Sequence, residues 1–260
     1  MNTPMPRYLF FLTLILLSIT HSFAADCKKG KTYALIVGIA SYQNSSFNLK
    51  YCDDDARDMY RILIKDNPSD QIILLINEEA TAKNIMGKMN FLFQKATQDD
   101  RIVFFYSGHG NVDCFIPYDG LPTGKSVLSF GTVKKAYRDS KAGQKFLIAD
   151  ACMSGSVRNK EENPSTKQMG EKKFSKEEII VFTSSRTNQL SIEFYPLGHG
   201  LFTYFLLKGI DGAADENNDK VITIKELYDY TRQQMISISK GNQVPVMWGR
   251  FDSALPFVCN

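Results

Sequence analysis

The sequence of 260 residues is 43% hydrophobic and 23% charged, enough to bury an ordinary globular core and unlike the composition of a disordered chain. Its formal net charge of +3 is too small to indicate nucleic acid as a partner, and no basic stripe interleaved with aromatic residues occurs. No linker rich in Pro, Gly or Ser divides the chain, so we expect one domain over residues 25–260.

Residues 1–24 have the pattern of a secretory signal peptide. Arg7 precedes an apolar run over residues 8–20, and Ser22 and Ala24 place small side chains at the two positions that signal peptidase inspects. A membrane anchor is the alternative, but the run is shorter than the roughly 18 residues that a span needs. We expect cleavage and export, to a periplasm or out of the cell, with no membrane attachment afterwards.

Five short apolar runs predict β-strands, at residues 33–39, 71–76, 101–106, 145–149 and 179–183. They are nearly continuous rather than alternating, which indicates strands covered on both faces. Helical spacing of apolar residues predicts helices over 53–65, 81–96, 198–210 and 224–238. Alternating strands and helices favour an α/β fold with a mostly parallel sheet and helices on both faces.

Two polar turns follow the third and fourth predicted strands, and parallel sheets carry their chemistry at this carboxyl edge. The third strand runs into Ser107-Gly108-His109-Gly110, and the fourth into Asp150-Ala151-Cys152. We expect Cys152 to be a nucleophile and His109 its general acid/base, with the N–H groups of Gly110 and Cys152 as oxyanion donors. Taken singly, a cysteine after a strand is usually core and a Gly-flanked histidine usually structural. His199, also flanked by glycines, is the rival base, although a helix-entry or substrate-rim role suits it better.

Residues 156–177 turn to Lys, Glu, Ser, Asn and Pro, which predicts a mobile exposed loop. Cys27 and Cys259 lie near the two ends of the mature chain and form our predicted disulfide, because export permits oxidation and chain ends are often neighbours. Cys52 and Cys114 are interpreted as small buried hydrophobic residues.

Residues 215–226 admit two interpretations. Asp215, Asn217, Asp219 and Glu226 stand where an EF-hand loop has calcium ligands, but Lys220 replaces the glycine of its sharp turn. The competing interpretation is a capping box, Thr223 with Glu226, that opens the last helix. We therefore expect no required cofactor, with calcium as an option that the sequence leaves open.

Five segments, in this order and spacing, resemble the caspase, metacaspase and paracaspase superfamily, particularly its bacterial members. They are YALIVGIASY, LKYCDDDARDM, RIVFFYSGHG, KFLIADACMSG and GLFTYFLLKGI, covering the chain from Lys31 to about Ile210. The resemblance implies a caspase-like sandwich with a central sheet of about six strands and a late strand within residues 244–251. It also implies a cysteine endopeptidase with His109 and Cys152 as its dyad, in which His109 protonates the leaving amine.

The resemblance to metacaspases also implies an acidic specificity pocket. Asp55 matches the acidic residue of the C-x-x-D pattern that begins at Cys52, Ser107 falls two residues before the histidine, and Asp150 two before the nucleophile. Two carboxylates in a partly desolvated pocket favour a cation, so we expect protein or peptide substrates cleaved after Arg or Lys. A helix start at 53–55, with Asp53 as the cap, is compatible with this.

Other outcomes stay open. Lysines and Arg158 in the predicted loop make self-cleavage chemically available, and a loop that is never cut is equally compatible with the sequence. A legumain-like or gingipain-like hydrolase of different specificity, and a catalytically silent caspase-like binding module, are the alternative functions.

Overall fold

The computed structural model describes residues 30–65, 71–111, 113–121, 126–151, 179–185 and 193–259. The predicted signal peptide at 1–24, Cys27, the predicted nucleophile Cys152 and the predicted loop at 156–177 lie outside these residues. Within the described part, no helix combines the length and the apolar character needed to cross a membrane.

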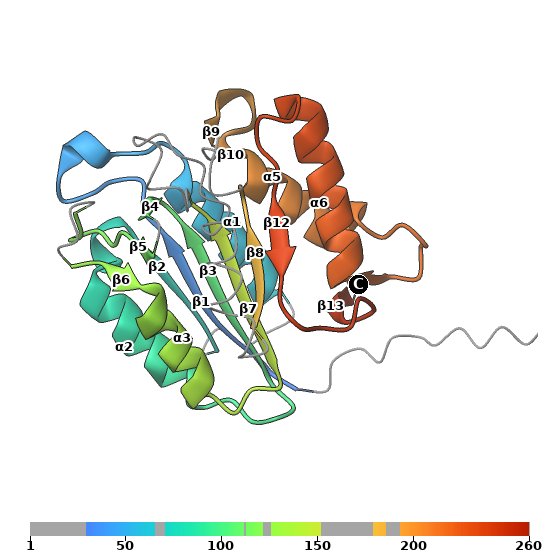
Figure 1. Ribbon diagram of the computed structural model, residues 1–260, viewed down its shortest axis with the longest axis horizontal. Helices are drawn as coiled ribbons and strands as arrows, with labels where there is room; N and C mark the ends of the chain where they lie inside the picture. Colours follow the sequence, from blue (N-terminus) through green and yellow to red (C-terminus); the bar gives the residue numbers. More distant parts are fainter. Residues whose placement is uncertain are drawn as a thin grey trace, which may run out of the picture.

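A six-stranded sheet forms the centre of the molecule, in the order β12-β8-β7-β3-β1-β2 (Figure 1). Its strands are β1 (Thr32–Gly38), β2 (Ile72–Ile76), β3 (Arg101–Ser107), β7 (Gln144–Asp150), β8 (Ile179–Thr183) and β12 (Val246–Trp248). The first five are parallel and confirm the five predicted strands, whereas β12, the predicted late strand, pairs antiparallel with β8 at the edge.

Helices cover both faces of this sheet, as predicted. One face carries α2 (Ala82–Phe93) and α3 (Phe130–Asp139), and the other carries α1 (Cys52–Ile64), α5 (Leu201–Lys208) and α6 (Ile224–Ser239) (Figure 1). Strand β1 shows why two cores form, because successive side chains of a strand point to opposite faces. Leu35 and Val37 pack with α2 and α3, while Ala34 and Ile36 pack with the other helices.

The remaining elements are short. A small three-stranded sheet contains β4 (Gly110–Asn111), β5 (Cys114–Phe115) and β6 (Leu128–Ser129), and antiparallel pairs join β9 (Glu193–Phe194) to β10 (His199–Gly200) and β11 (Val221–Thr223) to β13 (Pro256–Cys259). In the described part of the chain, 3-10 turns lie at η1 (Ser45–Phe47), η3 (Asn77–Glu79) and η4 (Tyr195–Leu197), and a π-turn, η5 (Gly209–Ala213), extends α5.

The C-terminal strand is anchored at the amino end of the central sheet. The buried Arg101 guanidinium donates from Nη1 to the carbonyl oxygen of Phe257 at 2.6 Å and lies over the Phe257 ring. Cys259 is disulfide-bonded, while Cys52 and Cys114 are free thiols. The predicted partner of Cys259, Cys27, falls outside the described residues.

Candidate active site

The register between β3 and β7 organises the site. Ser107 is paired with Asp150 in the parallel ladder, and Gly108 N donates to the Asp150 carbonyl oxygen at 3.1 Å. The prediction that these strands are neighbours is therefore confirmed. His109 comes two residues after Ser107, and Cys152 comes two residues after Asp150, so equal numbers of residues follow two paired positions at the same edge of the sheet.

The local contacts of His109 fix its tautomer. Its Nε2 lies 2.8 Å from the Phe47 carbonyl oxygen, which can only accept, so Nε2 carries a proton. In the neutral ring Nδ1 is then the unprotonated nitrogen. The backbone is held as well: His109 N donates to Tyr42 Oη at 2.7 Å, and Tyr106 Oη donates to His109 O at 2.8 Å.

Gly110 lies directly after this histidine in the short strand β4. Ile116 N donates to His109 O at 3.0 Å, which makes residues 109 and 116 a hydrogen-bonded antiparallel pair. Such pairs alternate along a ladder, so Gly110 occupies a non-hydrogen-bonded position opposite Phe115. Its N–H therefore points away from β5, as an oxyanion donor must.

The four residues expected in the acidic pocket, Cys52, Asp55, Ser107 and Asp150, lie close together at the carboxyl edge of the sheet. Ser107 Oγ donates to Asp55 Oδ2 at 2.8 Å, and Asp55 is 1% exposed. The Cys52 side chain is also hydrogen-bonded to Ser107. Asp150 is 5% exposed, and its Oδ2 accepts from Thr203 Oγ1 at 2.9 Å and Thr203 N at 3.2 Å.

Burial raises the pKa of both pocket carboxyl groups, and their mutual repulsion adds to this for Asp150. The pKa of Asp150 rises to about 7, first through desolvation and then through the charge of Asp55, against the lowering effect of the Thr203 hydrogen bonds. The pKa of Asp55 is also raised by desolvation, but hydrogen bonds from His199 and Ser107 oppose the shift.

Cys52 is a second thiol near the pocket, and its environment makes it a poor nucleophile. It is 6% exposed, and desolvation together with the charge of Asp55 holds its pKa well above the ordinary thiol value. A thiol attacks as thiolate, so Cys52 stays protonated and unreactive at neutral pH.

The start of α1 differs from the expectation that Asp53 caps the helix. Tyr51 is the N-cap residue and makes no side-chain capping bond, while Asp53 Oδ2 accepts from Asn77 Nδ2 at 3.2 Å. The cap prediction is therefore wrong. The three acidic residues 53–55 do occupy the first turn, where the helix dipole favours negative charge.

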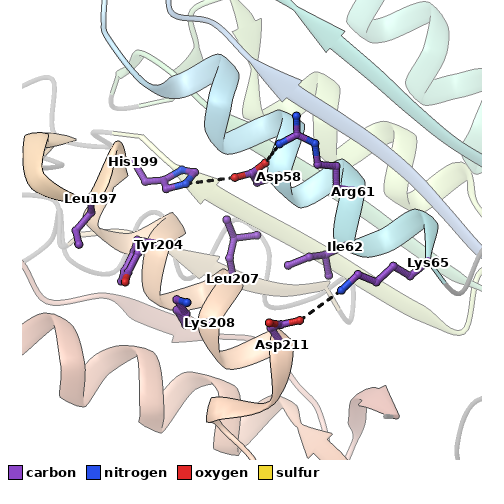
Figure 2. A pocket seen from close by; sticks show the side chains of 10 residues that line it. All are labelled: Asp58, Arg61, Ile62, Lys65, Leu197, His199, Tyr204, Leu207, Lys208 and Asp211. Carbon is purple, nitrogen blue, oxygen red and sulfur yellow. Dashed lines mark hydrogen bonds and ion pairs between the residues drawn. The ribbon is translucent and has the colours of Figure 1, made fainter.

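Next to the pocket, His199 joins two acidic residues of α1. Its Nδ1 lies 2.9 Å from Asp55 Oδ1, and its Nε2 lies 3.3 Å from Asp58 Oδ2. Figure 2 shows the second contact, with the imidazole reaching from the segment before α5 toward Asp58, which Arg61 also contacts. The expected helix-entry position of His199 is confirmed, because Gly200 is the N-cap of α5. Its pairing with Asp55 was not predicted.

On the far side of His199 an open pocket of about 380 Å³ lies between α1 and α5 (Figure 2). Ion pairs cross it, including Lys65 Nζ to Asp211 Oδ1 at 3.4 Å. Its lining mixes charges of both signs with Ile62, Leu197 and Leu207. His199 therefore separates this pocket from the buried carboxylates.

The 215–226 loop realises the capping box. Glu226 Oε2 accepts from Thr223 N at 2.8 Å, and Thr223 Oγ1 accepts from Glu226 N at 3.2 Å. Asp215 and Asn217 accept hydrogen bonds from Asp219 N, which closes the loop on itself. Among the residues for which coordinates are described, no cluster of three or more His, Cys, Asp or Glu side chains could hold a metal ion.

A mostly parallel sheet with helices on both faces and a histidine turn at its carboxyl edge defines an α/β fold. The caspase domain family matches residues 31–254, so the chain belongs to the caspase family of cysteine peptidases.

Plant metacaspases are among its relatives. Metacaspase-3 of Arabidopsis thaliana is 29% identical over 150 residues, which cover 49% of this chain and 41% of that protein. Metacaspase-2 of the same plant is 34% identical over 150 residues, covering 49% of this chain and 35% of that protein. A probable protease from a Desulfuromonadales bacterium is 24% identical over 259 residues, covering 83% of this chain and 31% of its own length. The matched region is thus less than half of each relative.

Two solved structures share the fold. A protein from Geobacter sulfurreducens superimposes with a TM-score of 0.63 at 19% identity, covering 86% of this chain and 96% of that one. Caspase-1 from Spodoptera frugiperda gives a TM-score of 0.60 at 12% identity, covering 85% and 87% respectively. At these identities the superpositions establish the caspase-like fold alone.

Proposed function

We propose that the chain is a cysteine endopeptidase that cleaves after Arg or Lys, with Cys152 as nucleophile and His109 as acid/base. The observation that carries this is the Ser107–Asp150 pairing. It starts the histidine and cysteine turns from the same level of two neighbouring strands, which suits a thiol and an imidazole that share one substrate carbonyl.

In this reaction His109 Nδ1 takes the proton of the Cys152 thiol, and the resulting thiolate attacks the carbonyl carbon to form a carbon–sulfur bond. The oxyanion is stabilised by the N–H groups of Gly110 and Cys152. The carbon–nitrogen bond then breaks as His109 Nδ1 gives its proton to the leaving amine, producing a thioester. Water activated by the neutral imidazole hydrolyses the thioester and regenerates the thiol.

The specificity part of the proposal rests on Asp55 and Asp150. Two buried carboxyl groups on the substrate side of the sheet edge disfavour each other's ionisation, and a guanidinium or ammonium between them relieves that repulsion. An acidic substrate side chain would instead add a third negative charge.

Hydrolysis of matched peptides that end in Arg, Lys, citrulline or Asp before the reporter group tests both parts. We expect Arg and Lys peptides to be cleaved, and Cys152→Ala and His109→Ala to lose at least about 1,000-fold in kcat/KM. A preference for Asp would overturn the specificity. Labelling of the wild type and the Cys152→Ala variant to equal extents by a thiol-directed probe would favour a silent binding module instead.

A further inference from the structure

The geometry around His199 favours a charged imidazolium. Its two ring nitrogens lie 2.9 Å and 3.3 Å from carboxylate oxygens of Asp55 and Asp58. A neutral imidazole has one N–H and would turn the lone pair of its other nitrogen toward a carboxylate oxygen, whereas the imidazolium presents an N–H to the hydrogen-bonded Asp55 and to the ion-paired Asp58. The side chain is 16% exposed, which limits the screening of these contacts by water.

The charged and titratable groups around His199 favour the cation. Those that surround it include Asp54, Asp55, Asp58 and Arg61 of α1, Lys65 directly after α1, Glu193 of the paired strand β9, Tyr204 and Lys208 of α5, Asp211 of η5 and, behind Gly200, Asp150 of β7. Arg61 is paired with Asp58, and Lys65 with Asp211. The groups that directly face the imidazole are therefore carboxylates.

Gly200 shows how close the two pocket carboxylates lie to one another and to His199. A Cβ atom at Gly200 would be 2.3 Å from Asp150 Oδ2 and 3.1 Å from Asp55 Oδ2, while Gly200 N donates to Asp55 Oδ1 at 3.2 Å. Both acids thus border the same backbone position. Two carboxylates this close in a buried site cannot both ionise cheaply unless a cation offsets one of them.

We propose that His199 sets the charge of the acidic pocket: its imidazolium offsets Asp55, so that Asp150 can carry the negative charge that receives the substrate's Arg or Lys side chain. His199 is a positioning residue in this scheme, since it acts on the substrate through the two carboxylates. The inference rests on the proposed specificity and adds the residue that allows Asp150 to be ionised at neutral pH.

The direction of the pH effect follows. The hydrogen bond to Asp55 raises the pKa of His199, so the imidazolium persists to a higher pH than that of an ordinary histidine. When the imidazolium is absent, the Asp55–Asp150 pair keeps one proton up to a higher pH, because ionising the second carboxyl group then costs more free energy. Recognition of a cationic side chain should therefore begin at a higher pH when His199 loses its charge.

The test compares the wild type with His199→Gln on Arg and citrulline peptides from about pH 6 to about pH 9. We expect the variant to lose about tenfold in kcat/KM for Arg at pH 7, mainly through KM, and its pH midpoint to rise by about one unit. The citrulline peptide should change less than about twofold, and activity on Arg should recover at high pH. Lys208→Gln removes a cation from the open pocket between α1 and α5, which Asp55 and Asp150 do not line, and should resemble the wild type. Equal losses on both peptides, or an unchanged midpoint, would overturn the inference.

A second measurement separates this inference from the specificity on which it rests. If the wild type does not prefer Arg over citrulline, the proposed specificity fails, yet the charge of His199 can still be read directly. In a Cys152→Ala background, NMR titration should place the His199 pKa above its ordinary value and lower it by about one unit in Asp55→Asn. No response to Asp55→Asn would refute the charge-setting role.

Discussion

The missing side chain at Gly200 lets the backbone pass between two buried carboxyl groups. The N–H of this residue reaches Asp55, and the space that a Cβ would take is filled by Asp150 Oδ2. The neighbouring imidazole depends on the same backbone path, because His199 precedes Gly200 directly. The backbone position of Gly200 thus fixes the spacing of Asp55, Asp150 and the His199 imidazole that faces Asp55.

Gly200→Ala should therefore disturb the pocket. The Cβ contact at 2.3 Å forces a backbone or carboxyl shift that costs on the order of 1–3 kcal/mol of unfolding free energy, and kcat/KM for Arg peptides should fall more than for citrulline. Denaturant unfolding and peptide kinetics check this. The control is Gly87→Ala at an exposed position of α2, where nothing lies within 4 Å of the new Cβ and stability should rise by about 0.5–1 kcal/mol. Unchanged stability and kinetics in Gly200→Ala would contradict the close approach.

At the scale of elements, periodicity located the central strands and four helices well. Strand β8 has the predicted bounds, and α6 begins where its apolar pattern begins. Helix α3 was not predicted, although Ser129 caps it and its buried positions, Phe130, Val133, Ala136 and Tyr137, have helical spacing. Strands of two residues, such as β4 and β10, are too short to carry a pattern, because their pairing is set by tertiary contacts.

The capping box at the start of α6 decides how the 215–226 loop behaves. Thr223→Ala should lower the unfolding free energy by about 1 kcal/mol, because it leaves an N-terminal amide of the helix without its acceptor. Glu226→Gln keeps an acceptor for Thr223 N and should stay within about 0.5 kcal/mol of the wild type. Calcium should not shift the melting temperature of either variant or of the wild type. A calcium-dependent rise in the wild type that Glu226→Gln abolishes would favour the ion site instead.

At the scale of the whole molecule, the sequence predicts which residues share a sheet edge better than which ones touch. The rule that parallel strands present their carboxyl ends together was enough to bring Ser107 and Asp150 to one edge, and the register confirms it. The contact between His199 and Asp55 spans 144 residues. It depends on how α5 packs beside α1, which no local pattern specifies.

Arg101 links two distant parts of the chain at the other end of the sheet. Its guanidinium holds the Phe257 carbonyl and Thr32 Oγ1 in a buried site, where desolvation lowers its pKa to about 10. Arg101→Lys cannot reproduce the planar fork of donors and should cost about 2–4 kcal/mol of stability. The kcat/KM of the folded fraction should stay unchanged. Arg138→Lys, an exposed replacement in α3, should be silent within about 0.5 kcal/mol. A specific loss of catalysis in Arg101→Lys would show that the two ends of the sheet are coupled.

The C-terminal strand β13 lies at the opposite end of the sheet from the histidine turn. Phe257 meets the first residue of β3, whereas the histidine turn follows the last residue of that strand, roughly 20 Å away along the sheet. Copies immobilised on a bead through residues added after Asn260 would therefore present the histidine turn to the solution, and peptides could reach it without passing the support.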